Sequence, residues 1–256
     1  MSEFIHVEAA GGVQRIEIRR ADKRNALTEE MYTALDQAFE RAAADESVRV
    51  VLLLGAPGVF TAGNDIADFI AHPPLDENAP VLRYLRRLSQ CEKPVIAGVA
   101  GVAVGIGSTM LLHCDYVIAS ENAQFVLPFV NLGLCPEAAS SLLLPLAIGH
   151  KRASEMLLFG ERVPAATALD WGIVNAVVAN DKLVEVAGKL AAVLAAKPLS
   201  ALIATKKLLR RSLAPAIAET LSIESRQFGE LLRSPAAKEC LTAFVEKRAP
   251  DPARFK

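Results

Sequence analysis

Two uninterrupted apolar runs, each followed by a turn that contains glycine, constrain the fold more than any other feature of this chain. The runs are VRVVLLLG at residues 48–55 and PVIAGVAG at residues 94–101. A strand that is buried on both faces has a nearly continuous apolar sequence, because helices cover both faces of a parallel sheet. These runs therefore predict strands inside an α/β core.

A helix and several shorter strands are expected around these two runs. The segment 13–20, VQRIEIRR, alternates apolar and polar residues, as a half-buried strand does. Thr28 can cap a helix whose apolar side chains recur on one face, namely Met31, Leu35, Ala38, Phe39 and Ala42. Further strands are expected at 115–120, 123–128 and 172–178, with helices after Asp181 and the last over about 235–248. This order predicts an α/β core followed by a helical C-terminal region.

The composition excludes several classes of protein. The chain of 256 residues is 52% hydrophobic and 22% charged, which is enough apolar surface for a sizeable core. The net charge is −1 and Lys and Arg are not clustered, so no nucleic-acid partner is expected. The four cysteines are widely spaced and the four histidines are scattered, which predicts reduced thiols and no metal site. The first residues lack the pattern of a signal peptide, so a cytoplasmic location is expected.

One stretch resembles a membrane span by composition alone. Residues 95–112 contain no charge, and Gly101 and Gly105 have the spacing found in packed membrane helices. The stretch also contains four glycines, and it lies between Lys93-Pro94 and Asp115. A buried strand, a glycine turn and a buried helix therefore fit better, and we expect no membrane association.

The two turns that follow the long apolar runs could bind a ligand through the main chain. They are FTAGND at 60–65 and VAVGIGST at 102–109. Neither is a Walker A motif, and the second contains no GxGxxG. Small residues allow close approach to the backbone, and two such turns side by side could direct two N–H donors at one oxygen. The alternative is that the glycines only permit tight packing between strand and helix.

Several motifs in the same order resemble the enoyl-CoA hydratase/isomerase (crotonase) superfamily. They are FTAGND, the PVIAGVAGVAVGIG…CDYVIAS stretch, QFVLPFVNLGL, ALDWGIVNAVV and AFVEKR, with NAL at 25–27. The resemblance implies an α/β fold: a crotonase-like spiral of strand–strand–helix repeats over residues 1–195, with a helical region for trimer contacts over 196–256. It also implies an acyl-CoA thioester as substrate, no separate cofactor because coenzyme A is part of that substrate, and a homotrimer or dimer of trimers.

The resemblance also implies roles for individual residues. The thioester oxygen would accept hydrogen bonds from the backbone amides of Asn64 and Ile106. Coenzyme A would lie along Arg24, Ala26, Ala62 and Asp65, with its phosphates near Lys23, Arg24 and Lys247. The other residues expected to contact the substrate are Gly63, Ile66, Gly105, Phe129 and Pro136.

The departures from the family pattern bear on the reaction. Hydratases of the family carry two glutamates, at the positions that Thr109 and Phe129 occupy here. Glu137 remains, in a segment that resembles the single-glutamate Δ3,Δ2-enoyl-CoA isomerases. It would remove a proton from C2 of a 3-enoyl thioester and return it at C4. An apolar wall of Phe129, Leu132 and Leu134 would raise the pKa of such a carboxyl towards neutrality.

Other interpretations stay open at this point. Glu137 can instead be a charge at the start of a helix, with Pro136 in its first turn. A hydratase or other lyase could draw a second acid from the loop that holds Asp76 and Glu77. A non-catalytic acyl-CoA-binding homologue is a third possibility. Asp65 and Asp68 are expected to cap the helix after the first turn, and Asp115 to be structural. Segments around 66–85 and 127–146 would line the acyl pocket.

Overall fold

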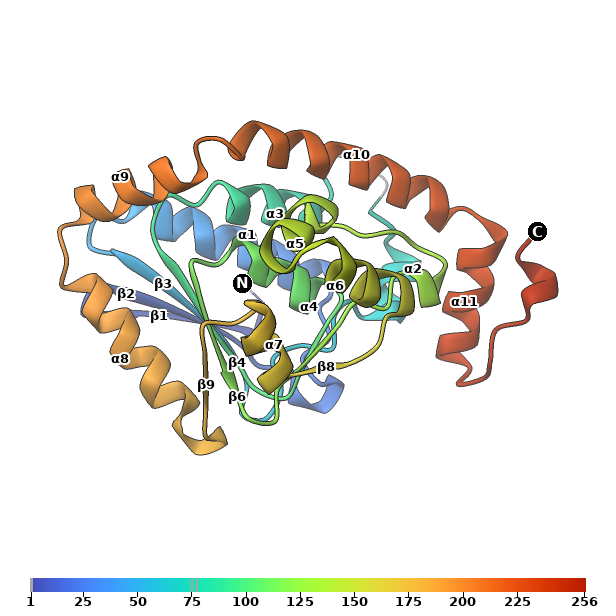
Figure 1. The fold of residues 1–256 in the computed structure, drawn as a ribbon, viewed down its shortest axis with the longest axis horizontal. Helices are drawn as coiled ribbons and strands as arrows, with labels where there is room; N and C mark the ends of the chain where they lie inside the picture. Colours follow the sequence, from blue (N-terminus) through green and yellow to red (C-terminus); the bar gives the residue numbers. More distant parts are fainter. Residues whose placement is uncertain (1, 75, 77) are drawn as a thin grey trace.

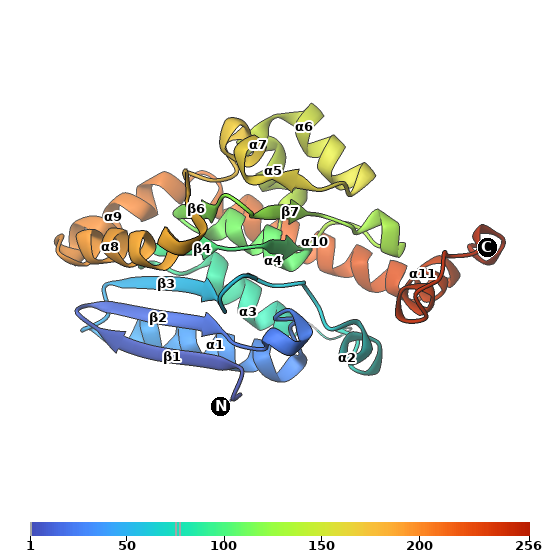
Figure 2. The same cartoon turned by 90° about the horizontal axis from the view of Figure 1, so that it is seen from below.

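The core of the computed structural model, which describes residues 2–74, 76 and 78–256, is a six-stranded sheet (Figures 1 and 2). Its strand order is β1-β2-β3-β4-β6-β9, in which β1 is antiparallel to β2 and every other pair is parallel. The strands are β1 (Ile5–Ala10), β2 (Val13–Ile18), β3 (Val50–Gly55), β4 (Val95–Val99), β6 (Tyr116–Ser120) and β9 (Ala176–Val178).

A second, three-stranded sheet stands beside the first. Its order is β5-β7-β8, formed by Val102–Val104, Gln124–Val126 and Val163–Pro164. The chain passes from β4 directly to β5 and from β6 directly to β7, so each of these two turns of the chain adds a strand to both sheets. Thr61 extends this sheet by a bridge to Ala103. The expected α/β repeats of two strands and a helix are therefore confirmed.

Helices cover both faces of the large sheet. In Figure 1, α1 and α8 lie on opposite sides of the strands. The helices are α1 (Glu29–Ala44), α2 (Ile66–Ala71), α3 (Pro80–Ser89), α4 (Ile106–Thr109), α5 (Ser140–Ile148), α6 (His150–Ser154), α7 (Ala165–Trp171), α8 (Leu183–Ala195), α9 (Leu199–Arg210), α10 (Ala214–Leu232) and α11 (Pro235–Val245). A 3₁₀ segment, Met110–His113, continues α4.

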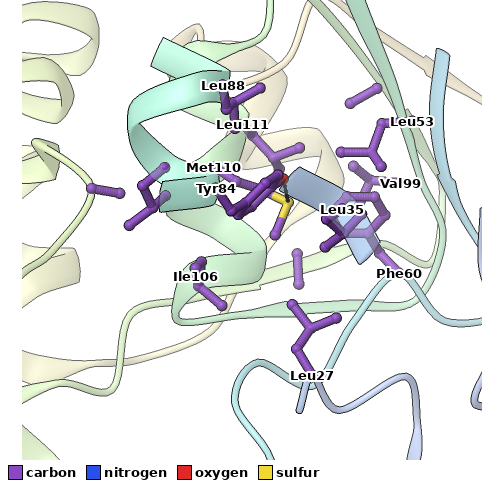
Figure 3. Close-up of a cluster of buried hydrophobic side chains, with 14 of the residues drawn as sticks. Leu27, Leu35, Leu53, Phe60, Tyr84, Leu88, Val99, Ile106, Met110 and Leu111 are labelled. Atoms are coloured by element: carbon purple, nitrogen blue, oxygen red, sulfur yellow. Dashed lines mark hydrogen bonds between the residues drawn. The ribbon is translucent and has the colours of Figure 1, made fainter. Parts of the chain in front are cut away.

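Successive side chains of β3 point to opposite faces of the large sheet, so they pack into two separate apolar clusters. Val51 and Leu53 join the larger cluster, under α1 and α3, whereas Leu52 and Leu54 meet α8 in a smaller one. Tyr84 lies fully buried in the larger cluster, with its hydroxyl 3.5 Å from the sulfur of Met110 (Figure 3). The VRVVLLLG run is thus apolar throughout because both of its faces are covered.

The C-terminal helices extend across the α/β core and are fastened to it by charged groups. Helices α9 and α10 arch over one side of the molecule, and α11 lies at the end where the chain terminates (Figure 1). On α9, the buried Lys206 ammonium donates to the Asp115 carboxylate at 2.6 Å and to the Lys93 carbonyl at 2.8 Å. Asp115 also accepts from the amide that begins β4, that of Val95. Its expected structural role is therefore confirmed.

The boundaries of several expected elements differ from the sequence prediction. The strand expected over 13–20 ends at Ile18, and that over 172–178 is reduced to Ala176–Val178. The uncharged stretch 95–112 contains β4, the extra strand β5 and a short helix. In the described part of the chain, no single helix is long and apolar enough to cross a membrane. One pair, Asn180–Ala195 with Leu199–Arg210, meets the length and composition test only jointly and is bent by 104°.

The Lys206 contacts generate a stability prediction. We expect Lys206→Ala to lower the free energy of unfolding by about 3 kcal/mol, because it leaves a partly buried carboxylate with one fewer partner. The control is Lys207→Ala: the neighbouring Lys207 is exposed and pairs with Glu92 at 3.9 Å, a contact worth roughly 0–1 kcal/mol. Urea unfolding measures both. Equal losses in the two variants would show that the buried contact does not fasten α9.

Candidate active site

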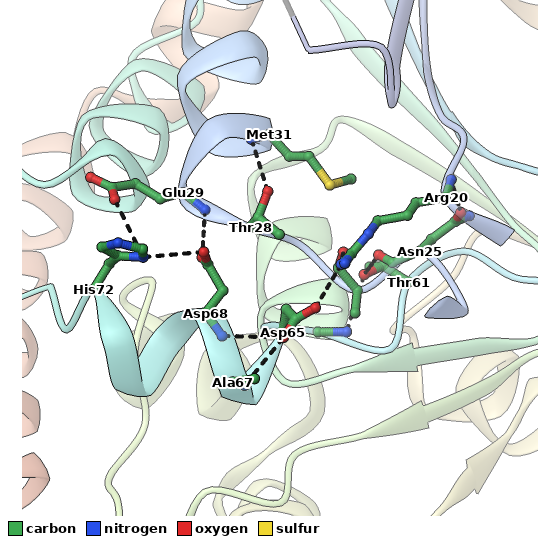
Figure 4. Close-up of polar contacts among 12 residues, drawn as sticks. Arg20, Asn25, Thr28, Glu29, Met31, Thr61, Asp65, Ala67, Asp68 and His72 are labelled. Carbon is green, nitrogen blue, oxygen red and sulfur yellow. Dashed lines mark hydrogen bonds and ion pairs between the residues drawn. The ribbon is translucent and has the colours of Figure 1, made fainter. Parts of the chain in front are cut away.

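The turn at residues 60–65 is held in place by Asn25, which lies in the NAL motif (Figure 4). The Asn25 side-chain amide donates to the carbonyls of Val59 and Phe60, at 3.0 and 3.1 Å. In return, the Thr61 hydroxyl donates to the Asn25 carbonyl at 2.6 Å. Asn25 is fully buried and has a φ of 57°. The motif therefore fixes the path of a turn more than thirty residues away in sequence.

Asp65 has a structural role at the end of this turn. Its carboxylate accepts from the amides of Ala67 and Asp68 and so caps α2, as expected, and it pairs with Arg20 at 2.7 Å (Figure 4). Burial would raise the pKa of Asp65, but these donors lower it overall. The prediction for Asp68 was wrong: it does not cap α2 but accepts from the Glu29 amide, at the first turn of α1. Thr28 caps α1, as expected, by accepting from Met31.

Two amides are left without a protein acceptor where the two glycine turns meet. Beside Asn64, the Gly63 amide donates to the Thr61 hydroxyl and the Asp65 amide donates to the Leu27 carbonyl. Beside Ile106, the Gly105 amide donates to the Val126 carbonyl. Ile106 is the first residue of α4, so its own amide has no partner within the helix. Across residues 2–74, 76 and 78–256, the Asn64 and Ile106 amides donate to no protein group.

Glycine is required at the point of closest approach between the turns. Gly63 has a φ of 85°, and a Cβ there would lie 2.7 Å from the Val104 carbonyl oxygen. Gly105 precedes α4 with a φ of 53°, a conformation that L side chains rarely adopt. The glycines thus permit tight packing, and the same packing brings the two amides to one cavity.

That cavity has a volume of about 330 Å³ and contains one carboxyl group. Asn64, Ile106 and Glu137 all line it, together with apolar residues from both turns and from α10 and α11. Glu137 is the only acidic residue among its described lining residues. The Thr109 hydroxyl donates to the Glu137 carboxyl. A single acid therefore shares an apolar cavity with two free amides.

The surroundings of Glu137 raise the pKa of its carboxyl and so disfavour the ionised form. Burial raises the pKa of Glu137 to about 8, and the negative charge of Glu224 adds to the effect, while the Thr109 hydroxyl opposes it. The Tyr32 hydroxyl, whose pKa burial raises well above its usual value, stays neutral and donates to the Asn64 side-chain oxygen. The charge of Glu137 contributes to that shift of Tyr32, so the two groups interact.

The backbone beside Glu137 is strained. Ala138 and Ala139 have φ values of 59° and 56°, a left-handed conformation that costs an alanine roughly 1–2 kcal/mol. Helix α5 begins only at Ser140, so the alternative that Glu137 is a charge at a helix start is wrong. The carboxylate that accepts from the start of α5 is Glu224 on α10, which bonds the amides of Ala139 and Ser141 at 2.6 and 2.9 Å.

The other predicted substrate-binding residues divide into two groups. Ala62, Gly63, Ile66, Gly105 and Phe129 line the cavity, as do Leu132 and Leu134 of the expected apolar wall. The remaining predicted residues are absent from its described lining: Lys23, Arg24, Ala26, Asp65, Pro136 and Lys247. Lys23, Arg24 and Lys247 are exposed, and the Arg24 carbonyl accepts from the Ala62 amide at 3.0 Å, which places this basic turn next to the cavity wall.

Sequence reasoning missed several residues that build the site. They are Tyr32, His113, Glu224, Phe228 and Arg248. Glu224 could have been found, because it falls in the apolar stripe of α10 among Ile217, Leu221 and Phe228. Another, larger cavity, of about 940 Å³, lies between α3, α9 and α10. Neither Glu137 nor the Asn64 and Ile106 amides line it, so volume alone does not locate the site. No cluster of potential metal ligands occurs among the described residues.

Comparisons with known proteins show which family and which solved structures this chain resembles. The sequence pattern of the family described as "Enoyl-CoA hydratase/isomerase" matches residues 8–253. The chain is 34% identical to 1,2-epoxyphenylacetyl-CoA isomerase and 36% identical to 2,3-dehydroadipyl-CoA hydratase, both from Escherichia coli K12, with 98% of each chain covered. A crystal structure of an enoyl-CoA hydratase/isomerase from Pseudoalteromonas atlantica T6c superposes with a TM-score of 0.93 at 40% identity, covering 97% of this chain and 99% of that one.

The Thr109 contact predicts a change in the titration of Glu137. Thr109→Ala removes a hydrogen bond that favours the ionised carboxyl, so the pKa of Glu137 should rise further above its value of about 8. Thr109→Ser, which keeps the hydroxyl, should restore the original pKa. Carboxyl ¹³C NMR, with the Glu137 signal assigned by its loss in Glu137→Gln, measures the midpoint. An unchanged midpoint in Thr109→Ala would contradict the assigned contact.

Proposed function

The chain belongs to the enoyl-CoA hydratase/isomerase family, and on that basis we propose that it is an enoyl-CoA isomerase that converts a 3-enoyl-CoA to the trans-2-enoyl-CoA. At the coarser level it is an acyl-CoA enzyme of the crotonase superfamily, a hydratase or an isomerase. The observation that carries the finer assignment is the single carboxyl in the cavity, that of Glu137.

The two free amides supply the first part of the proposed mechanism. The thioester carbonyl oxygen accepts from the Asn64 and Ile106 amides. Removal of a proton from C2 moves charge onto that oxygen as a dienolate forms. Each donor of this kind is worth roughly 3 kcal/mol in a transition state, because it is already aligned and needs no reorganisation.

Glu137 supplies the second part. Its ionised carboxyl takes the proton from C2 and, once protonated, returns it to C4, so that the double bond moves from C3–C4 to C2–C3 and the acid ends as it began. Hydration, in contrast, needs one group to activate water and another to supply a proton. Thr109 and Phe129, at the positions where the resemblance places the hydratase glutamates, are unable to fill those roles.

The apolar lining supports proton transfer without water. Phe129, Leu132 and Leu134 line the cavity, and burial brings the pKa of Glu137 close to neutral. A group whose pKa lies near the working pH can both accept and return a proton. The proton taken from C2 is returned to C4, so Glu137 is regenerated in each cycle.

The remaining parts of the proposal concern coenzyme A and assembly. Lys23, Arg24 and Lys247 are exposed cations that would bind its phosphates, with the pantetheine passing Ala26 and Ala62. Residues 1–195 would form the acyl-CoA-binding core, and 196–256 would make trimer contacts. A second cavity of about 300 Å³ shares Asn64 and Phe69 with the first.

Enoyl-CoA hydration is the second candidate function, because several similar proteins bear that name. The acid that it would need was expected near Asp76 and Glu77. Asp76 lines the second cavity rather than the one that holds Glu137, and Glu77 lies outside the described residues. Formation of a 3-hydroxyacyl-CoA from a 2-enoyl-CoA would favour this function. Failure to turn over any acyl-CoA, with a rise in melting temperature on adding one, would favour the non-catalytic acyl-CoA-binding homologue.

Substitution of Glu137 tests the proposed isomerase directly. Glu137→Gln should lower kcat for a 3-enoyl-CoA by about 10³-fold, because the amide is unable to take the C2 proton. The melting-temperature rise on binding an unreactive acyl-CoA should remain. Glu121→Gln, an exposed glutamate outside the cavity, is the control. Ultraviolet absorbance of the conjugated product follows the reaction, and wild-type rates in Glu137→Gln would overturn the assignment.

The pH dependence of the wild-type enzyme is a separate test. Since the base must be ionised in the free enzyme and the pKa of Glu137 is raised to about 8, kcat/KM should increase with pH up to about 8 and level off above it. An ordinary glutamate would give a plateau from about pH 5 upwards. A profile that is already flat between pH 5 and 7 would contradict proton transfer by a buried Glu137.

A further inference from the structure

Glu224 is a buried carboxylate in a position where an apolar residue is expected. It lies on α10 (Ala214–Leu232) between Leu221 and Phe228, both of which face the core, and only 5% of it is exposed. No ion pair to Glu224 occurs among the described residues. A buried carboxylate without a cation is costly unless several hydrogen-bond donors surround it. Its retention in the stripe indicates a role other than packing.

Glu224 takes the place of the missing cap of α5. The residue before α5 is Ala139, whose side chain is unable to accept a hydrogen bond. One Glu224 oxygen accepts from the Ala139 amide at 2.6 Å, and the other accepts from the Ser141 amide and hydroxyl at 2.9 and 2.5 Å. All three partners donate, so the arrangement suits the ionised carboxylate. A helix distant in sequence thus completes the turn that directly follows Glu137.

The opposite side of this turn is also fixed. The buried His113 ring donates from Nε2 to the Ala138 carbonyl at 2.8 Å, and burial lowers the pKa of His113 to about 4, so the ring is neutral. His113 and Glu224 therefore hold two successive left-handed alanines, Ala138 and Ala139, between them. Such a conformation persists only where the surroundings determine it.

Among the described residues, Glu224 carries the negative charge that acts on Glu137. The other titratable groups whose interactions reach Glu137 are Tyr32 on α1, Tyr84 on α3 and Cys135 on the same loop, and burial raises the pKa of each, so they are neutral. Thr109 on α4 is uncharged, and Arg248, after α11, lines the cavity but is paired with Glu239. The charge of Glu224 raises the pKa of Glu137.

We propose that Glu224 is a positioning residue for proton transfer: by capping the strained turn at residues 138–139 it aims the Glu137 carboxyl into the cavity. This role rests on the proposed function of Glu137. It makes the C-terminal helix α10 part of the site through a residue that does not touch the substrate.

Two substitutions separate the charge from the hydrogen bonds. Glu224→Gln removes the charge and presents an amide donor to groups that also donate, so kcat should fall about tenfold to a hundredfold with KM within about twofold. The pH midpoint of kcat/KM should also fall, because a nearby negative charge is lost. Glu224→Asp keeps the charge but is one methylene shorter, so kcat should fall while the midpoint stays near that of the wild type. Glu219→Gln, an exposed glutamate on the same helix, should change neither quantity.

Carboxyl ¹³C NMR gives a readout that does not depend on the reaction. In Glu224→Gln the titration midpoint of Glu137 should fall. If that midpoint falls but the wild-type protein does not isomerise a 3-enoyl-CoA, the charge coupling between Glu224 and Glu137 stands and the proposed function fails. If Glu224→Gln does not fold, Glu224→Asp carries the test. Loss of melting temperature alone, with kcat and the midpoint of the folded variants as in the wild type, would overturn the proposal and leave Glu224 a structural residue.

Discussion

The main-chain amides of Asn64 and Ile106, which have no acceptor among the described residues, are the constraint on which the rest of the site depends. The neighbouring amides of Gly63, Asp65 and Gly105, in contrast, are all bonded within the protein. An unpaired N–H group facing an apolar cavity costs free energy in the folded protein and is usually avoided. A carbonyl oxygen that binds there accepts a hydrogen bond from both amides at once. These two bonds are stronger when the oxygen carries negative charge, so the site favours the transition state over the bound substrate.

The ionisation of Glu137, the acid beside these amides, also depends on the groups that surround it. Glu137 and Glu224 are two carboxyls near each other in a region of low polarity, and both have a raised pKa, chiefly because of burial. Glu224 is surrounded by three donors, whereas Glu137 has the Thr109 hydroxyl. The additional donors around Glu224 favour its ionised form more than the single Thr109 hydroxyl favours that of Glu137. Different hydrogen-bonding environments thus give two chemically identical groups different roles.

Much of the fold could be predicted from local sequence, but the site only in part. The apolar runs located β3 and β4, and Thr28 located the start of α1, because these signals depend on neighbouring residues. The short strands β5 and β8 were missed, because β5 lies within the uncharged stretch 95–112, which predicts one strand, a turn and a helix, and β8 has only two residues. Glu137 stood out as a lone acid in an apolar stretch. The contacts that hold it come from Thr109, His113 and Glu224, and only the folded chain brings these residues together.

A crystal structure with an unreactive acyl-CoA bound would show whether the thioester binds to the two free amides beside Glu137. The thioester oxygen should lie about 2.7–3.1 Å from both the Asn64 and Ile106 nitrogens, with the Glu137 carboxyl over C2 and C4 of the acyl chain. No second carboxyl should lie within reach of C3. A thioester oxygen bonded elsewhere, or a Glu137 carboxyl turned away from the acyl carbons, would contradict the proposed mechanism.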